Sequence, residues 1–157
     1  MALDQLCWIA TAALGAHVAE EGVLDWPGWV RAVGKVEVDW KSFYLVNAAG
    51  ILWGIVCAEV ASAMPLVALS LPALLLINAT FFHVPGFILG RGRFSPGLIS
   101  AVVLFYPIGI LGYKCAYDTG VLTRTNLIGS LLLGAAVMLA PVLLFQARTL
   151  PYFRQDK

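Results

Sequence analysis

The chain has 157 residues, of which 61% are hydrophobic and only 12% are charged, and its formal net charge is +1. A typical soluble domain has roughly 45–50% apolar and about 25% charged residues, so this chain has too few charges to cover a water-facing surface. The small net charge also excludes the basic footprint of a nucleic-acid-binding protein. We therefore expect an integral membrane protein that contacts membrane lipids and no nucleic acid.

Charged side chains are almost absent from two long stretches. From residue 42 to residue 90 only Glu59 is charged, apart from the titratable His83, and from residue 125 to residue 146 there is no charge at all. A hydrocarbon layer about 30 Å thick requires roughly 20 apolar residues in a helix that crosses it. Both stretches are therefore predicted to lie in a membrane.

Polar interruptions divide the chain into five predicted membrane helices, at about 3–21, 43–63, 65–90, 96–117 and 125–148. The first is the least hydrophobic of the five. The polar connection at 22–41 contains Trp26, Trp29 and Trp40, and it favours a short helix in the headgroup region. The predicted fold class is an all-α transmembrane helical bundle, with about five spanning helices and a short interfacial helix in one domain, residues 1–157.

Basic residues indicate the orientation. With five spans, one side of the membrane holds at most two of them, Lys114 and Arg124. The other side holds the remaining eight, which are Arg31, Lys35, Lys41, Arg91, Arg93, Arg148, Arg154 and Lys157. Cytoplasmic loops carry an excess of Lys and Arg, so we expect the N-terminus outside and the C-terminus in the cytoplasm, in a bacterial inner membrane.

The end of the first predicted helix carries three ionisable residues. His17 is followed by Glu20 and Glu21, and residues three and four apart lie on the same helix face. Ionisable groups at membrane depth are costly and are normally turned inward or paired. The three residues are candidates for catalysis, although the two glutamates could also simply mark where the helix leaves the membrane.

A second polar group lies near the end of the third predicted helix. Helices one and three run in the same direction, so Asn78 and His83 fall at the depth of His17, and both are further catalytic candidates. Asn78 and His83 are five residues apart and differ by roughly 140° on a regular helix, unless Pro85 loosens the winding or Asn78 faces another partner. Three more polar residues are candidates for substrate binding, namely Asn47, Thr80 and Arg93.

These motifs carry a resemblance to a known family. His17-Val-Ala-Glu20-Glu21 resembles the signature of the HXXEE-domain membrane proteins, and the similarity continues through Asn47, Asn78 and His83. It extends to the stretches Arg-Phe-Ser-Pro-Gly at 93–97 and Tyr-Pro-Ile-Gly at 106–109. The resemblance implies a small helical membrane protein with a polar His/Glu/Asn site, and it implies no particular reaction.

The residues themselves favour an enzyme. Burial in an apolar pocket favours the neutral form of a carboxylic acid, so one glutamate could donate a proton while a neighbouring carboxylate or histidine accepts one. Such a site suits isomerisation or cyclisation of a lipophilic small molecule, such as a terpenoid or a polyketide, with no cofactor. Asn78 and His83 would orient the substrate or stabilise developing charge.

Two alternatives stay open. Two histidines and two glutamates are also a sufficient ligand set for zinc or iron, although carboxylates are few, so we expect no resident metal. Ionisable residues within a membrane also mark ion paths, so a small transporter or accessory subunit is the third reading. Gly50 and Gly54, like Gly86 and Gly90, are spaced for close helix approach, either inside the bundle or in a homo-oligomer.

Overall fold

The computed structural model describes residues 1–91 and 93–148, and the regular secondary structure in this part of the chain is all helical, with no strand. Arg154 and Lys157, two of the basic residues counted for orientation, lie outside the described residues, as does the end of the predicted domain, 149–157. The described helices, in chain order, are α1 (Leu3–Val23), α2 (Trp26–Trp29), α3 (Trp40–Glu59), α4 (Pro65–Asn78), α5 (Val84–Leu89), α6 (Leu98–Ser100), α7 (Tyr106–Asp118) and α8 (Arg124–Arg148).

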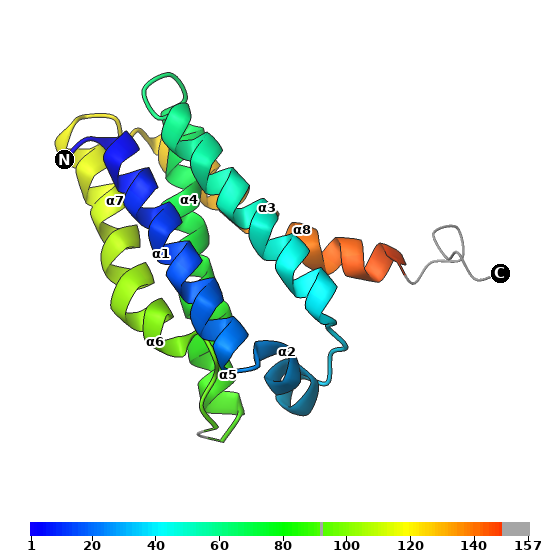
Figure 1. Ribbon diagram of the computed structural model, residues 1–157. Helices are drawn as coiled ribbons and strands as arrows, with labels where there is room; N and C mark the ends of the chain where they lie inside the picture. Colours follow the sequence, from blue (N-terminus) through cyan, green and yellow to red (C-terminus); the bar gives the residue numbers. More distant parts are fainter. Residues whose placement is uncertain (92, 149–157) are drawn as a thin grey trace.

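The helices form a bundle, as the sequence predicts (Figure 1). Helix α1 packs against α3, α4 and α7, and α8 packs along α4. The N-terminus lies at one end of the bundle, whereas α2, α5 and α6 lie at the opposite end, where α1 finishes. The polar residues in the C-terminal half of α1 therefore lie at this second end of the bundle.

Three π-helical segments interrupt the α-helices: η1 (Val30–Gly34), η2 (Ala79–His83) and η3 (Ala101–Phe105). The last two each end two residues before a proline, at Pro85 and Pro107. A proline inside a helix lacks the N–H of a regular hydrogen bond, and its ring clashes with the carbonyl four residues earlier. Wider π turns accommodate both effects. The loosened winding before Pro85, one of the two alternatives that the sequence left open, is present in η2.

Four of the described helical stretches are long and apolar enough to cross a membrane, namely Trp40–Glu59, Pro65–Leu89, Leu98–Asp118 and Arg124–Pro141. They correspond to predicted helices two to five. The first predicted span, α1, is not in this group, although it is 21 residues long and packs within the bundle. Its three acidic residues, Asp4, Glu20 and Glu21, account for its lower hydropathy.

The connection between α1 and α3 forms the short helix that the sequence predicts. It begins at Trp26 and continues through the π turn to Gly34. The side chain of Asp25 accepts a hydrogen bond from the Gly28 N–H and so caps this short helix. Asp39 caps α3 in the same way, by accepting from the Ser42 N–H at 2.8 Å.

Small residues permit close helix packing inside the bundle. A Cβ added to Gly54 would collide with the Thr11 side chain on α1, and one added to Gly86 would meet the Trp29 ring at 2.8 Å. Both glycines therefore serve packing within one chain. The three cysteines are free, with Cys7 and Cys57 buried and Cys115 partly exposed.

Candidate functional site

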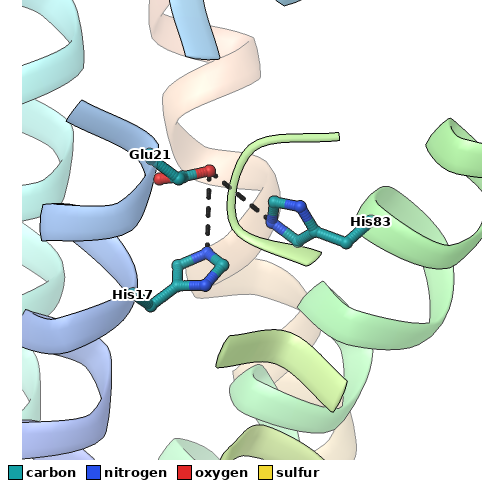
Figure 2. A group of neighbouring side chains, drawn as sticks. All are labelled: His17, Glu21 and His83. Atoms are coloured by element: carbon teal, nitrogen blue, oxygen red, sulfur yellow. Dashed lines mark ion pairs between the residues drawn. The ribbon is translucent and has the colours of Figure 1, made fainter. Parts of the chain in front are cut away.

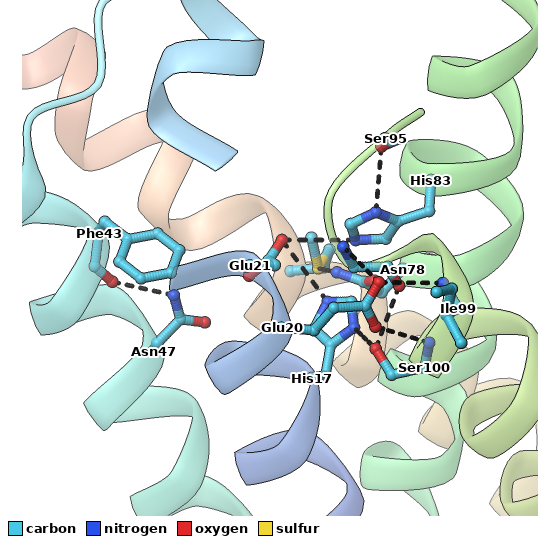
Figure 3. Close-up of polar contacts among 12 residues, drawn as sticks. His17, Glu20, Glu21, Phe43, Asn47, Asn78, His83, Ser95, Ile99 and Ser100 are labelled. Atoms are coloured by element: carbon cyan, nitrogen blue, oxygen red, sulfur yellow. Dashed lines mark hydrogen bonds and ion pairs between the residues drawn. The ribbon is translucent and has the colours of Figure 1, made fainter. Parts of the chain in front are cut away.

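His17 and Glu21 lie one turn apart on the same face of α1, and this face is buried. The side chains are only 2% and 7% exposed. Glu20 lies on the neighbouring face and points toward the start of α6 (Figure 3). The two adjacent glutamates of the motif therefore have different surroundings.

His83 reaches the same centre from the end of η2, the π segment that follows α4. Its Nε2 lies 3.5 Å from Glu21 Oε1, and His17 Nε2 lies 3.6 Å from the same oxygen (Figure 2). The two imidazole rings meet edge to face, with centroids 4.6 Å apart. The predicted proximity of His17, Glu21 and His83 is thus confirmed, and we call these three residues the His/Glu centre.

Ser100 holds the His17 ring in place. Its oxygen lies 2.8 Å from His17 Nδ1 and 3.2 Å from the Gly97 carbonyl. When the hydroxyl donates to Gly97, Nδ1–H is the donor of the shorter bond and Nε2 carries the lone pair of the neutral ring. This Nε2 faces Glu21 and has no hydrogen-bond partner.

Glu20 binds the backbone at the start of the membrane helix that begins at Leu98. Its carboxylate accepts hydrogen bonds from three N–H groups, those of Gly97 at 3.1 Å, Ile99 at 3.2 Å and Ser100 at 2.8 Å. The first N–H groups of a helix have no partner within it and favour a negative charge. Glu20 therefore caps the helix that begins at Leu98, and so holds Ser100 beside His17.

The backbone at Gly97 passes close to both imidazole rings of the centre. Its φ is +89°, a conformation that residues with a Cβ rarely adopt. An added Cβ would lie 2.6 Å from His83 Cε1 and 2.7 Å from His17 Cε1. Only glycine lets the backbone pass this close to both imidazoles.

The surroundings of the centre combine an apolar wall with serine hydroxyls. The fully buried Phe105 ring lies 4.4 Å from the His17 ring, centroid to centroid. Ser95, which is 1% exposed, places its hydroxyl 3.5 Å from His83 Nδ1. In the sequence, Ser95 follows the second polar group and belongs, with Gly97, to the Ser-Pro-Gly stretch that the family resemblance quotes. Sequence reasoning assigned no role to Gly97 and did not single out Ser100.

The other candidate residues make their described contacts elsewhere. Asn47 donates to the Phe43 carbonyl of its own helix at 3.0 Å (Figure 3), and Thr80 donates to the Tyr106 hydroxyl at 3.2 Å on an exposed part of the bundle. Asn78 Nδ2 contacts Met138 Sδ on α8 at 3.8 Å, so it faces a different partner, and its Oδ1 is buried without one. The side chain of Arg93 is exposed.

Fold and site together define a helical membrane protein with a buried His/Glu centre between α1, η2 and the start of α6. The family model described as "Protein of unknown function with HXXEE motif" matches residues 8–111, and the chain belongs to this family. The match covers the histidine and both glutamates of the motif, together with His83 and Ser100. No curated protein and no solved structure matches the chain.

Proposed function

We propose that this protein is an integral membrane enzyme that transforms a lipophilic small molecule at the His/Glu centre. The observation that carries the proposal is the meeting of one carboxylate and two imidazoles in a buried centre. Glu21 Oε1 lies 3.6 Å from His17 Nε2, which has no hydrogen-bond partner, and 3.5 Å from His83 Nε2. A buried carboxylate between two imidazoles is stabilised by a positive charge shared among the three groups, and that charge can act as an electrophile.

With a proton as this charge, the centre performs acid–base chemistry. Glu21 in its neutral form adds its proton to an alkene, a carbonyl or an epoxide, and a histidine then removes a proton from the neighbouring carbon. The overall result is an isomerisation, or a cyclisation when another part of the substrate attacks the cation. A terpenoid or a polyketide provides such groups and partitions into a bilayer.

The two glutamates take different roles in this proposal. Glu21 is the proton donor, because it touches both imidazoles and is buried. Glu20 already binds three backbone N–H groups, so we assign it to positioning the start of α6. The roles proposed from sequence for Asn47, Asn78, Thr80 and Arg93 find no support in their described contacts.

We further propose a bacterial inner membrane with the N-terminus outside, which places the centre toward the cytoplasmic leaflet. The support is the excess of basic residues at the end of the bundle that carries Arg31, Arg91 and Arg93. Single cysteines introduced at Arg93 and at Thr119, in a chain that lacks Cys115, test it. A membrane-impermeant reagent added outside intact cells should label position 119 and spare position 93; the reverse pattern would contradict this orientation.

The enzyme proposal is tested by proton exchange. The protein in detergent and D2O is incubated with a panel of unsaturated terpenoids and polyketides, and deuterium uptake is measured by mass spectrometry. Removing a general acid costs about 10²–10⁴-fold in rate, so Glu21→Gln should abolish the exchange. Glu59→Gln, an exposed carboxylate outside the centre, is the matched control and should leave it unchanged. Exchange at the normal rate in folded Glu21→Gln protein would contradict the assignment.

A further inference from the structure

The distances within the His/Glu centre do not fit direct hydrogen bonds. Glu21 Oε1 lies 3.6 Å from His17 Nε2 and 3.5 Å from His83 Nε2, whereas N–H···O bonds have lengths of about 2.7–3.2 Å. Two nitrogen or oxygen ligands that lie 2.0–2.2 Å from a tetrahedral metal ion are about 3.4 Å apart. The two Glu21–histidine spacings therefore fit a shared ion better than direct hydrogen bonds.

The three donor atoms also converge as a set. One ligand atom from each of His17, Glu21 and His83 lies within 4.8 Å of the other two, and all three residues are buried. In Figure 2 both rings turn a nitrogen toward the same carboxylate oxygen. Two imidazoles and one carboxylate are the protein ligands of several catalytic zinc sites and of non-haem iron sites.

The outer sides of the two rings are arranged as metal-bound histidines usually are. A ligating histidine commonly donates its other ring N–H to a neighbouring acceptor, which fixes the ring and its tautomer. His17 Nδ1 lies 2.8 Å from the Ser100 hydroxyl oxygen, and His83 Nδ1 lies 3.5 Å from the Ser95 hydroxyl oxygen. The buried Nε2 of His17 has no hydrogen-bond partner and is directed into the centre.

Charge supports the same conclusion. Among the side chains that the structure describes, Glu21 lies beside the two histidines and forms no ion pair with a lysine or an arginine. A buried carboxylate without a cation is costly, and both histidines need their Nε2 lone pairs to act as ligands. A divalent cation at the centre satisfies all three side chains at once.

We propose that His17 Nε2, His83 Nε2 and Glu21 Oε1 bind one divalent transition metal ion of the zinc or iron(II) type. The inference rests on the proposed function in that both use the same site, and it assumes no particular substrate. With a metal bound, Glu21 is a deprotonated ligand and no longer the proton donor. The metal would then take the place of the proton as the electrophile, and positions beyond the three protein ligands would serve substrate or water. From the sequence we expected no resident metal, because carboxylates are few. The sequence does not give the distances between the Glu21 carboxylate and the two imidazoles, and these distances favour a metal.

The test uses the full chain, purified in detergent, stripped with a chelator and titrated with Zn²⁺ or Co²⁺. We expect uptake of about one ion per chain, with visible absorption bands for the cobalt form. His17→Ala and Glu21→Gln should each abolish this uptake, whereas Glu59→Gln should retain it. Ser100→Ala keeps all three ligands and should weaken binding by about 10–100-fold, as loss of an outer hydrogen bond does in known metal sites.

Two results would overturn the metal site: folded wild-type protein that takes up neither ion, or uptake that survives in both His17→Ala and Glu21→Gln. Melting temperatures of all variants show that each is folded when it is titrated. The outcome is separable from the enzyme proposal. Proton exchange by chelator-treated protein would support the enzyme proposal and contradict a required metal. Metal binding without any turnover would support the metal site and contradict the enzyme proposal.

Discussion

The two ends of the bundle carry charged residues in opposite ways. At the end where α1 begins, Lys114 and Asp118 form an ion pair with side chains 62% and 53% exposed. At the end where α1 finishes, the side chains of the His17–Glu21 pair are 2% and 7% exposed. Both pairs have the same i,i+4 spacing on a helix, so the sequence pattern alone does not separate a solvated pair from a buried centre.

What separates the ends is the chain that covers them. The turn at 95–97 and the start of α6 close over the His/Glu centre, whereas the other end holds an open cavity of about 500 Å³ that is lined in part by Asp4, Trp8 and Glu59. A charge that water can reach is inexpensive, and a charge enclosed by helices is not. The enclosed end is therefore where a functional explanation is needed.

A pair of glycine substitutions provides the strongest test of whether the chain covers one end of the bundle more closely than the other. Gly97 and Gly120 both have positive φ, +89° and +72°, and they lie at opposite ends. Gly97→Ala adds backbone strain of about 1–2 kcal/mol and steric overlap of about 1–3 kcal/mol, because its Cβ meets both imidazoles. Gly120→Ala has open space and should cost the backbone strain alone. Thermal unfolding in detergent measures both, and equal losses would contradict the close cover at Gly97.

A second substitution sharpens the difference between the adjacent glutamates. Glu20→Ala removes the acceptor of three backbone N–H groups and should destabilise the protein by about 1–3 kcal/mol. Glu20→Gln keeps one oxygen acceptor and should cost less. Amide hydrogen exchange at Ser100 provides the local measurement, and we expect faster exchange in Glu20→Ala. Unchanged exchange at this amide would mean that Glu20 does not cap the helix.

The smallest effect is expected at the exposed end. Lys114→Ala removes one partner of the pair with Asp118, and exposed i,i+4 pairs contribute about 0.3–0.5 kcal/mol. The melting temperature should therefore change little, and less at high salt, since surface pairs are screened. A loss of several kcal/mol would show that this end also contains a buried polar network.

Much of the fold is predictable from the sequence because helix length in a membrane is set by the bilayer. The predicted ranges 65–90 and 125–148 agree with the structure to within one residue at each end. The range 43–63 is displaced by about three to four residues, because Asp39 caps the helix earlier than the apolar run begins. Hydropathy indicates where apolar residues start, and the cap indicates where the helix starts.

The site is only partly predictable. Helix periodicity and parallel direction bring His17, Glu21 and His83 together, and these signals are present in the sequence. Asn78 shares their depth but turns toward Met138, because direction around a helix next to a π segment does not follow from a 3.6-residue period. The role of Glu20 as a cap depends on a backbone about eighty residues further along, and no local pattern indicates it.

The central claim is that the Nε2 lone pair of His17 faces Glu21 in a centre shared with His83. Nitrogen-15 NMR of the purified protein with labelled histidine measures it directly, since the chain has two histidines and His83→Ala assigns both signals. We predict that neutral His17 is protonated on Nδ1 and bare or metal-bound on Nε2, with a through-space contact to the His83 ring. A His17 ring protonated on Nε2, or two rings without mutual contact, would contradict the account.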